Sequence, residues 1–195
     1  QGNATTGCGV DKSSVEYGSC EVLLGECTAS QAIVPVAENT FWLLPTNQDL
    51  TSAEVRLLTT TEGRESRLRD ALAPVRADYD LVFIDCPPSL NMLTVNALVA
   101  ADSVIVPMQC EYYALEGLSA LVATIGQIRD AANPGLHLEG ILRTMFDPRN
   151  NLANEVSAQL LEHFGDTVFR TVIPRNVRLA EAPSFGKPVL LHDKD

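Results

Sequence analysis

The stretch Asp78-Tyr-Asp-Leu-Val-Phe-Ile-Asp-Cys-Pro-Pro-Ser89 decides the fold class of this chain. Its four consecutive apolar residues, Leu81 to Ile84, do not alternate with polar ones, which is typical of a strand covered on both faces in a parallel sheet. The run ends on the carboxylate of Asp85, and the two prolines that follow cannot continue a strand ladder. We therefore predict a buried strand over residues 80–85 with Asp85 at its carboxyl end.

Asp85 is the first candidate for a functional residue. Open α/β sheets bind their ligands outside the carboxyl ends of the strands. A single acid at that edge is suited to holding a hydrated magnesium ion beside a nucleotide phosphate. An acid that merely caps a turn would give the same local pattern, so both interpretations of Asp85 stay open at this point.

Strand and helix patterns alternate along the rest of the chain. Apolar runs predict strands at residues 40–44, 103–108, 138–144 and 168–173. A period of about 3.6 residues predicts helices at 48–58, 64–77, 89–100, 112–132 and 151–164, with a weaker one at 13–32. Gln1 to Gly9 is expected to be a loop, and Ser89 to cap its helix. The alternation predicts a single α/β domain over residues 1–195, with a mostly parallel sheet flanked by helices.

Composition and charge restrict the classes of function. Hydrophobic residues make up 46% and charged residues 20% of the chain, and no apolar run approaches the roughly 18 residues that cross a bilayer. The five cysteines form no Cys-x-x-Cys pair, so zinc is not expected. A net charge of −11 disfavours a generally basic nucleic-acid-binding protein. Residues 143–187 nevertheless carry six Lys and Arg against five Asp and Glu, which is compatible with a local basic face.

Five stretches together resemble the ParA/Soj family of chromosome- and plasmid-partition ATPases, deviant Walker P-loop proteins related to MinD. The matching runs are Gln1-Gly-Asn-Ala-Thr-Thr-Gly7, Asp80-Leu-Val-Phe-Ile-Asp-Cys-Pro-Pro-Ser-Leu90, Gln109-Cys-Glu-Tyr-Tyr-Ala-Leu-Glu-Gly-Leu118, Thr144-Met-Phe-Asp-Pro-Arg-Asn-Asn-Leu152 and Ile173-Pro-Arg-Asn-Val-Arg-Leu-Ala-Glu-Ala-Pro-Ser-Phe-Gly-Lys-Pro188. They occur in the order of the family and span most of the chain. The resemblance implies a P-loop NTPase-like fold, ATP hydrolysis, and ATP and Mg as cofactors.

Two departures from the family pattern bear on activity. No Gly-x-x-x-x-Gly-Lys-Ser/Thr occurs in the 195 residues, whereas the family carries a glycine-rich phosphate loop with two lysines ahead of its Gln-Gly-Asn. The family's closing helix should follow Asp193. We therefore expect an internal fragment, incomplete at both ends, that does not hydrolyse ATP alone. Because the family's first strand is central in the sheet, we also expect uncovered apolar faces.

The resemblance implies roles for individual residues. Asp85 matches the acid that holds the magnesium shell through water. The positions that match the walls of the adenine pocket are Thr144, Met145, Pro174, Asn176 and Val177. An adenine needs flat apolar contact and a few amide-type partners on its edge, although ordinary loops after strands would have a similar composition.

Arg149 and Arg178 match positions where relatives place arginines against the DNA backbone. Arginine suits a phosphate because its planar fork donates two hydrogen bonds. The alternative is a pair of solvated arginines that bind Asp147 or Glu181 of the same chain. Arg175 is a further candidate for contact with DNA.

The resemblance thus implies a cytoplasmic, nucleoid-associated ATPase without a membrane anchor that drives chromosome or plasmid partition. Such a protein forms a homodimer with ATP, binds DNA without sequence preference and is stimulated by a ParB-type partner. Residues 109–118 are expected to help form the dimer. Two alternatives stay open: a non-catalytic DNA- or partner-binding remnant, and a MinD-like positioning ATPase, which needs a C-terminal amphipathic helix.

Overall fold

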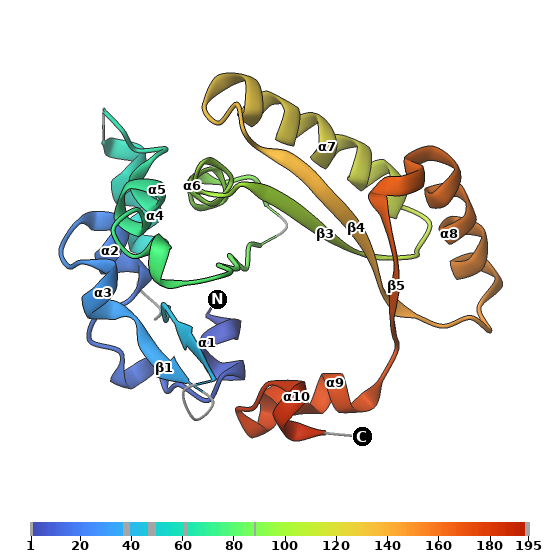
Figure 1. Ribbon diagram of the computed structural model, residues 1–195, viewed down its shortest axis with the longest axis horizontal. Helices are drawn as coiled ribbons and strands as arrows, with labels where there is room; N and C mark the ends of the chain where they lie inside the picture. The colour runs from blue at the N-terminus through green and yellow to red at the C-terminus, as the bar shows by residue number, and fades with distance from the viewer. Residues whose placement is uncertain (1, 37–39, 47–49, 61, 88, 194–195) are drawn as a thin grey trace. The chain divides into compact units, whose positions relative to one another are not determined.

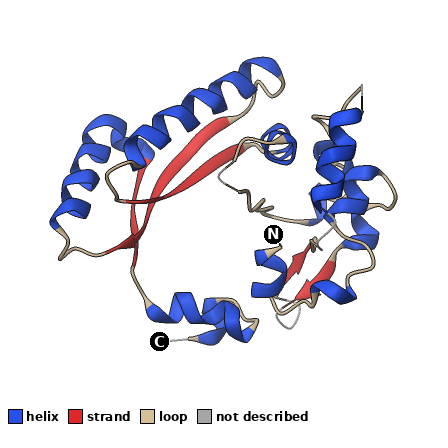
Figure 2. Cartoon of the chain, turned by 180° about the vertical axis from the view of Figure 1, so that it is seen from behind, coloured by secondary structure: helices blue, strands red, loops and turns tan. Residues whose placement is uncertain are grey.

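The computed structural model describes residues 2–36, 40–46, 50–60, 62–87 and 89–193. The chain divides into two compact units, residues 101–176 and the combination of residues 1–100 with 177–195 (Figure 1). Within the described residues the strands form a two-stranded and a three-stranded sheet, and helices accompany both (Figure 2). The predicted α/β fold class is therefore confirmed. No helix in the described part of the chain combines the length and apolarity that crossing a bilayer requires.

The second unit, residues 101–176, is built on a parallel sheet with the strand order β3-β4-β5. The strands are β3 (Ser103–Gln109), β4 (His137–Phe146) and β5 (Val168–Pro174). Helix α7 (Ala114–Ala131) follows β3, and α8 (Asn151–Phe164) follows β4. Parallel strands need such long crossovers, which is why the alternation of patterns predicted this part of the sheet correctly.

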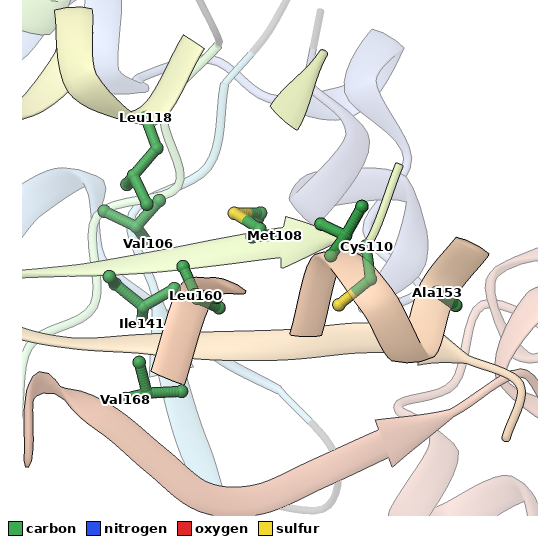
Figure 3. Close-up of a cluster of buried hydrophobic side chains, with 9 residues drawn as sticks. Val106, Met108, Cys110, Leu118, Ile141, Ala153, Leu160 and Val168 are labelled. Atoms are coloured by element: carbon green, nitrogen blue, oxygen red, sulfur yellow. The ribbon is translucent and has the colours of Figure 1, made fainter. Parts of the chain in front are cut away.

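One face of this sheet carries the core of the second unit. Val106 of β3, Ile141 of β4 and Val168 of β5 are buried in a single cluster. Figure 3 shows Leu118 of α7 pointing toward Val106, and Leu160 of α8 lying beside Ile141. Both helices therefore cover the same face of the sheet, and their apolar stripes exclude water from it.

Helix α8 has the bounds that the sequence predicts. The Oδ1 atom of Asn150 accepts the N–H of Leu152 at 3.0 Å, which is the pattern of an N-cap. Gly165, with a φ of +46°, ends the helix and begins a 3-10 turn (Gly165–Thr167). Helix α7 is shorter than predicted, since it begins at Ala114 and ends at Ala131.

The first unit, residues 1–100 with 177–195, is mainly helical. Its described helices are α1 (Asn3–Gly7), α2 (Ser19–Leu24), α3 (Ala29–Ala32), α4 (Leu50–Thr59), α5 (Arg67–Leu72), α6 (Met92–Ala100), α9 (Val177–Glu181) and α10 (Val189–His192), with 3-10 turns at Lys12–Ser14, Arg76–Asp78 and Ala182–Phe185. An antiparallel pair joins β1 (Val34–Val36) to β2 (Phe41–Leu43). Val22 of α2 and Ala29 and Ala32 of α3 pack with Val75 in an apolar cluster of this unit.

Residues 80–85 are not a buried strand, contrary to the prediction. The backbone from 81 to 87 is irregular, and Leu81, Val82 and Phe83 are 75%, 51% and 80% exposed. An apolar run becomes a strand only where a neighbouring strand supplies partners for its N–H and C=O groups. No strand ladder of the described residues includes this segment, so its sequence pattern alone does not order it as a strand.

Three other local predictions in the first unit are wrong. The helix predicted at 13–32 is divided into α2 and α3 because Gly25, with a φ of +73°, ends α2. The helix predicted at 64–77 is shorter, since α5 ends at Leu72 and Pro74 cannot continue a helix. Residues 3–7 of the expected N-terminal loop form α1.

The cap of α6 also differs from the prediction. Asn91, and not Ser89, accepts the N–H of Thr94 through its Oδ1 atom at 3.0 Å. The Ser89 carbonyl oxygen instead accepts the hydroxyl of Thr94 at 2.7 Å. Both residue types are common N-caps, so composition alone does not choose between them.

Candidate functional site

The carboxyl ends of the three parallel strands meet at one edge of the sheet in the second unit. Thr144 of β4 is the register partner of Gln109 in β3, and Phe146 of β4 is the partner of Pro174 in β5. The N–H of Arg175 donates to the carbonyl oxygen of Phe146 at 3.1 Å, which continues the contact past the end of β5. This is the edge at which α/β sheets bind ligands.

Most of the predicted adenine-pocket residues belong to this edge. Thr144 and Met145 end β4 beside Pro174 at the end of β5, and Asn176 follows two residues later and is exposed. Val177 begins α9 in the first unit and is 69% exposed. The structure thus brings together the predicted residues of the second unit, while Val177 is described with the first.

Met145 has an unusual backbone for its residue type. Among the described residues other than glycine, it alone has a positive φ, at +49°. Such a conformation costs on the order of 1–3 kcal/mol and persists where the surrounding structure holds it, often at binding sites. The Met145 side chain is 44% exposed at this edge. A polarisable thioether beside an exposed proline offers flat apolar contact to an aromatic ligand.

Arg143, directly before Thr144, joins β4 to its neighbours. It is only 9% exposed, and its Nη1 atom donates to the Ser157 hydroxyl of α8 at 2.9 Å. Its Nη2 atom donates to the carbonyl oxygens of Phe169 at 3.2 Å and Arg170 at 3.4 Å in β5. The Nε atom has no hydrogen-bond partner among the residues that the structure describes. A buried guanidinium with these contacts stiffens the strand end that carries Thr144 and Met145.

From the sequence, Arg143 was only one of the six basic residues in the range 143–187. A signal was available, because Arg143 shares with buried Ile141 the face of β4 that points toward α8. A charged side chain at an inward position of a strand must find hydrogen-bond partners inside the protein. The pattern therefore predicts that Arg143 connects β4 to its neighbours.

A tight turn between β4 and α8 carries Arg149. The N–H of Asn150 donates to the Asp147 carbonyl oxygen at 3.0 Å, which closes a β-turn with Pro148 at its second position. The Nδ2 atom of Asn154 donates to the Pro148 carbonyl oxygen at 2.8 Å and fastens the turn to α8. The Arg149 side chain at this turn is 88% exposed.

Asp147 binds Arg149 through both carboxylate oxygens. The Nε atom of Arg149 donates to Oδ1 at 2.9 Å and its Nη2 atom donates to Oδ2 at 2.8 Å, while its backbone N–H donates to Oδ1 at 3.0 Å. The side-chain and then the backbone hydrogen bonds from Arg149 lower the pKa of Asp147 to about 2, and the charges of Arg149 and Arg175 act in the same direction.

Arg178 also has acidic neighbours, in the first unit. Its Nη1 atom donates to Glu181 Oε2 at 3.3 Å, and its Nε atom lies 3.5 Å from Asp193 Oδ2. The alternative in which Arg149 binds Asp147 and Arg178 binds Glu181 is therefore the arrangement in the structure. These pairs are exposed, and exposed ion pairs exchange partners readily because they contribute little to stability.

Asp85 lies in the irregular segment of the first unit and is exposed. Within the described ranges, no three His, Cys, Asp or Glu side chains gather into a group that could hold a metal ion. A lone exposed carboxylate fits magnesium, which needs only one or two carboxylates and completes its shell with water and phosphate oxygens. The sheet edge belongs to the other unit, so Asp85 and that edge are described separately.

Comparisons with known proteins agree with this fold. Residues 1–138 match the family model described as an AAA domain. The chain is 52% identical over 192 residues to the chromosome-partitioning ATPase Soj of Thermus thermophilus, covering 98% of this chain and 72% of that protein. It is 49% identical over 193 residues to the chromosome partitioning protein ParA of Myxococcus xanthus, covering 99% of this chain and 68% of that protein.

A solved structure is also similar. It is a cobyrinic acid a,c-diamide synthase from Mycobacterium smegmatis with a bound ATP analog and magnesium. The TM-score is 0.84 at 38% sequence identity, and the match covers 95% of this chain and 76% of that one.

Proposed function

Because the chain belongs to the ParA/Soj family of chromosome-partitioning ATPases, we propose that it drives chromosome or plasmid segregation by an ATP-dependent cycle. ATP binding promotes a homodimer, the dimer binds DNA without sequence preference, and a ParB-type partner stimulates hydrolysis. Residues 1–195 serve as a single ATPase domain, and the protein acts in the cytoplasm on the nucleoid. The 195 residues alone, which contain no Walker A sequence, do not hydrolyse ATP.

One observation carries the proposal for nucleotide binding: the ends of β4 and β5 lie side by side, with Phe146 paired to Pro174. This register brings Thr144, Met145 and Pro174 to the carboxyl edge of the parallel sheet, the edge at which such sheets generally bind ligands. Met145 and Pro174 supply apolar contact, and the carboxamide of Asn176 suits the polar edge of an adenine. Val177, the residue after Asn176, keeps its proposed role in adenine binding and is described with the first unit.

Asp85 is the proposed magnesium-binding acid. Bound magnesium-ATP supplies the phosphoryl group and a divalent charge that offsets the negative charge of the phosphate oxygens. Asp85 would hold that ion through water, a role for which an exposed carboxylate is suited.

DNA binding is assigned to Arg149 and Arg178, with Arg175 as an additional contact. Both Arg149 and Arg178 are exposed by more than half of their side chains, and both pair with partly exposed acids. A guanidinium that contacts backbone phosphates adds affinity for every sequence alike and makes binding weaken with salt.

The nucleotide proposal is tested by phosphate release from the intact gene product in the presence of DNA. We expect Asp85→Ala to abolish turnover, whereas Asp78→Ala, at an exposed acid of the preceding 3-10 turn, leaves it unchanged. Asn176→Ala should weaken ATP binding about tenfold, the effect of one lost hydrogen bond to a ligand, and Thr171→Ala should not. Full turnover by Asp85→Ala would refute the magnesium role.

The same assay separates the alternatives. An intact gene product that binds DNA but releases no phosphate under any of these conditions would be the non-catalytic remnant. For the DNA contact, Arg149→Ala together with Arg178→Ala should weaken binding to unrelated duplexes equally and flatten the salt dependence. A loss confined to one sequence would contradict backbone contact.

A further inference from the structure

The turn that presents Arg149 is held in place independently of that side chain. The hydrogen bond from the Asn150 N–H to the Asp147 carbonyl closes the turn, and the bond from Asn154 to the Pro148 carbonyl ties it to α8. Arg149 therefore projects from a defined backbone position at the end of β4. A cation on such a backbone loses little freedom when it binds an anion.

Asp147 occupies one complete edge of the Arg149 guanidinium. That edge consists of the Nε and Nη2 donors, at 2.9 Å and 2.8 Å from the two carboxylate oxygens. A phosphate that binds arginine with two parallel hydrogen bonds uses an edge of the same kind. The carboxylate thus makes the contact that a DNA phosphate would make.

The charge of Asp147 also acts on a second arginine. The positive charge of Arg175 stabilises the Asp147 carboxylate, and the Arg175 N–H binds the Phe146 carbonyl directly before it. One carboxylate therefore offsets part of the positive charge of two cations. On a chain with a net charge of −11, this further reduces the local positive charge near Arg149.

We propose that Asp147 is an internal competitor of DNA phosphate for Arg149. In the free protein Asp147 holds the guanidinium, and DNA binding transfers that guanidinium to a phosphate. The exchange is inexpensive because the pair is exposed, and it makes affinity lower and more responsive to conditions than Arg149 alone would allow. This inference rests on the proposed contact of Arg149 with DNA.

Asp147→Asn is the sharpest test, because asparagine keeps an Oδ1 acceptor for the Arg149 backbone N–H and so preserves the turn. It removes the charge and the second acceptor of the pair. The control is Asp166→Asn, which changes the net charge equally at the opposite end of α8. Binding of a random-sequence duplex to the intact gene product with ATP and Mg is measured by fluorescence anisotropy between about 50 and 200 mM salt.

We expect Asp147→Asn to bind DNA about fivefold more tightly at the lowest salt, the size of one exposed contact between unit charges. The slope of log affinity against log salt should stay close to that of the unsubstituted protein, because Arg149 contacts a phosphate in both complexes. Asp166→Asn should change neither quantity appreciably. Arg149→Ala in the Asp147→Asn background should remove the gain, since the competition acts on that one side chain.

Several results would overturn the inference. Equal or weaker binding by Asp147→Asn, while Arg149→Ala still weakens binding, would show that Asp147 does not compete and would leave the DNA proposal intact. An equal gain from Asp166→Asn would assign the effect to net charge. Unchanged binding by Arg149→Ala would refute both the contact of Arg149 with DNA and the competition that depends on it.

Discussion

The backbone of Gly9 crosses that of Gly186 so closely that a Cβ atom added to Gly9 would lie 2.6 Å from the Gly186 carbonyl oxygen. Both residues have positive φ, +80° and +61°. Gly9 comes shortly after α1, and Gly186 follows the 3-10 turn Ala182–Phe185, so the crossing joins segments of the first unit that are far apart in sequence. Glycine meets both demands because it has no Cβ atom.

We expect Gly9→Ala to lower the free energy of unfolding by about 2–4 kcal/mol, the sum of left-handed strain and a backbone clash. Gly25→Ala is the matched control, since Gly25 has a φ of +73° but no atom of the described residues lies within 4 Å of an added Cβ. The control should lose only about 1 kcal/mol. Equal losses for the two variants in urea unfolding would argue against the close crossing.

Asn96 of α6 binds three backbone groups while it is fully buried. Its Oδ1 atom accepts the Leu68 N–H at 3.1 Å, and its Nδ2 atom donates to the carbonyl oxygens of Arg64 at 2.8 Å and Met92 at 3.0 Å. Asn96→Leu leaves buried backbone groups without partners, and we expect a loss of about 2–4 kcal/mol. Asn151→Leu, at an exposed position of α8, should stay within about 0.5 kcal/mol. Thermal or urea unfolding of both variants checks this difference.

We expect the Arg143 side chain to stabilise the fold of the second unit. Arg143→Met removes the donors for Ser157 and for the Phe169 and Arg170 carbonyls, and we expect a loss of about 2–4 kcal/mol. Arg170→Met, at an exposed arginine of β5, should cost less than about 0.5 kcal/mol. If Arg143→Met unfolds at the same urea concentration as the unsubstituted chain, the three hydrogen bonds do not stabilise the fold.

The pairing of Arg149 with Asp147 predicts a specific pH dependence. Arg149 binds the ionised carboxylate and lowers the pKa of Asp147 to about 2 in the folded chain. A lowered pKa means that the pair stabilises the folded state above the ordinary aspartate pKa of about 3.9 and that this contribution is lost as the pH falls toward 2.

Carboxyl carbon NMR of Asp147 measures this value directly. We expect a titration midpoint near 2 in the unsubstituted protein and a return toward about 3.9 in Arg149→Ala, because the largest cause of the shift is then absent. Arg170→Ala should leave the midpoint in place. A midpoint near 4 in the unsubstituted protein would mean that the pair does not persist in solution.

Local sequence patterns predicted a helix or strand correctly where the residues that define it lie close together in the sequence. Helix α8 has a capping residue, an amphipathic stripe and a terminating glycine within its own sequence, and its predicted bounds are correct. β3 and β5 were predicted to within one residue, because the crossovers α7 and α8 bring them beside β4. The five family motifs identified the ParA/Soj family without the structure.

Local sequence patterns failed to predict the structure of residues 80–85 and the contacts of Asn96. The apolar run is a clear strand pattern, yet it is irregular because no strand of the described residues pairs with it. Asn96 looked like an ordinary helix residue, and its partners Arg64 and Leu68 lie about 30 residues away.

The sequence by itself determined the α/β class, the order of most helices and strands, and the family, because these depend on periodicity and on runs of neighbouring residues. Tertiary structure decided which groups meet: Phe146 with Pro174, Arg143 with Ser157, and Gly9 with Gly186. The physical reason is that hydrogen bonds and close contacts form between atoms that the folded chain brings within a few ångströms, and no local pattern encodes that distance.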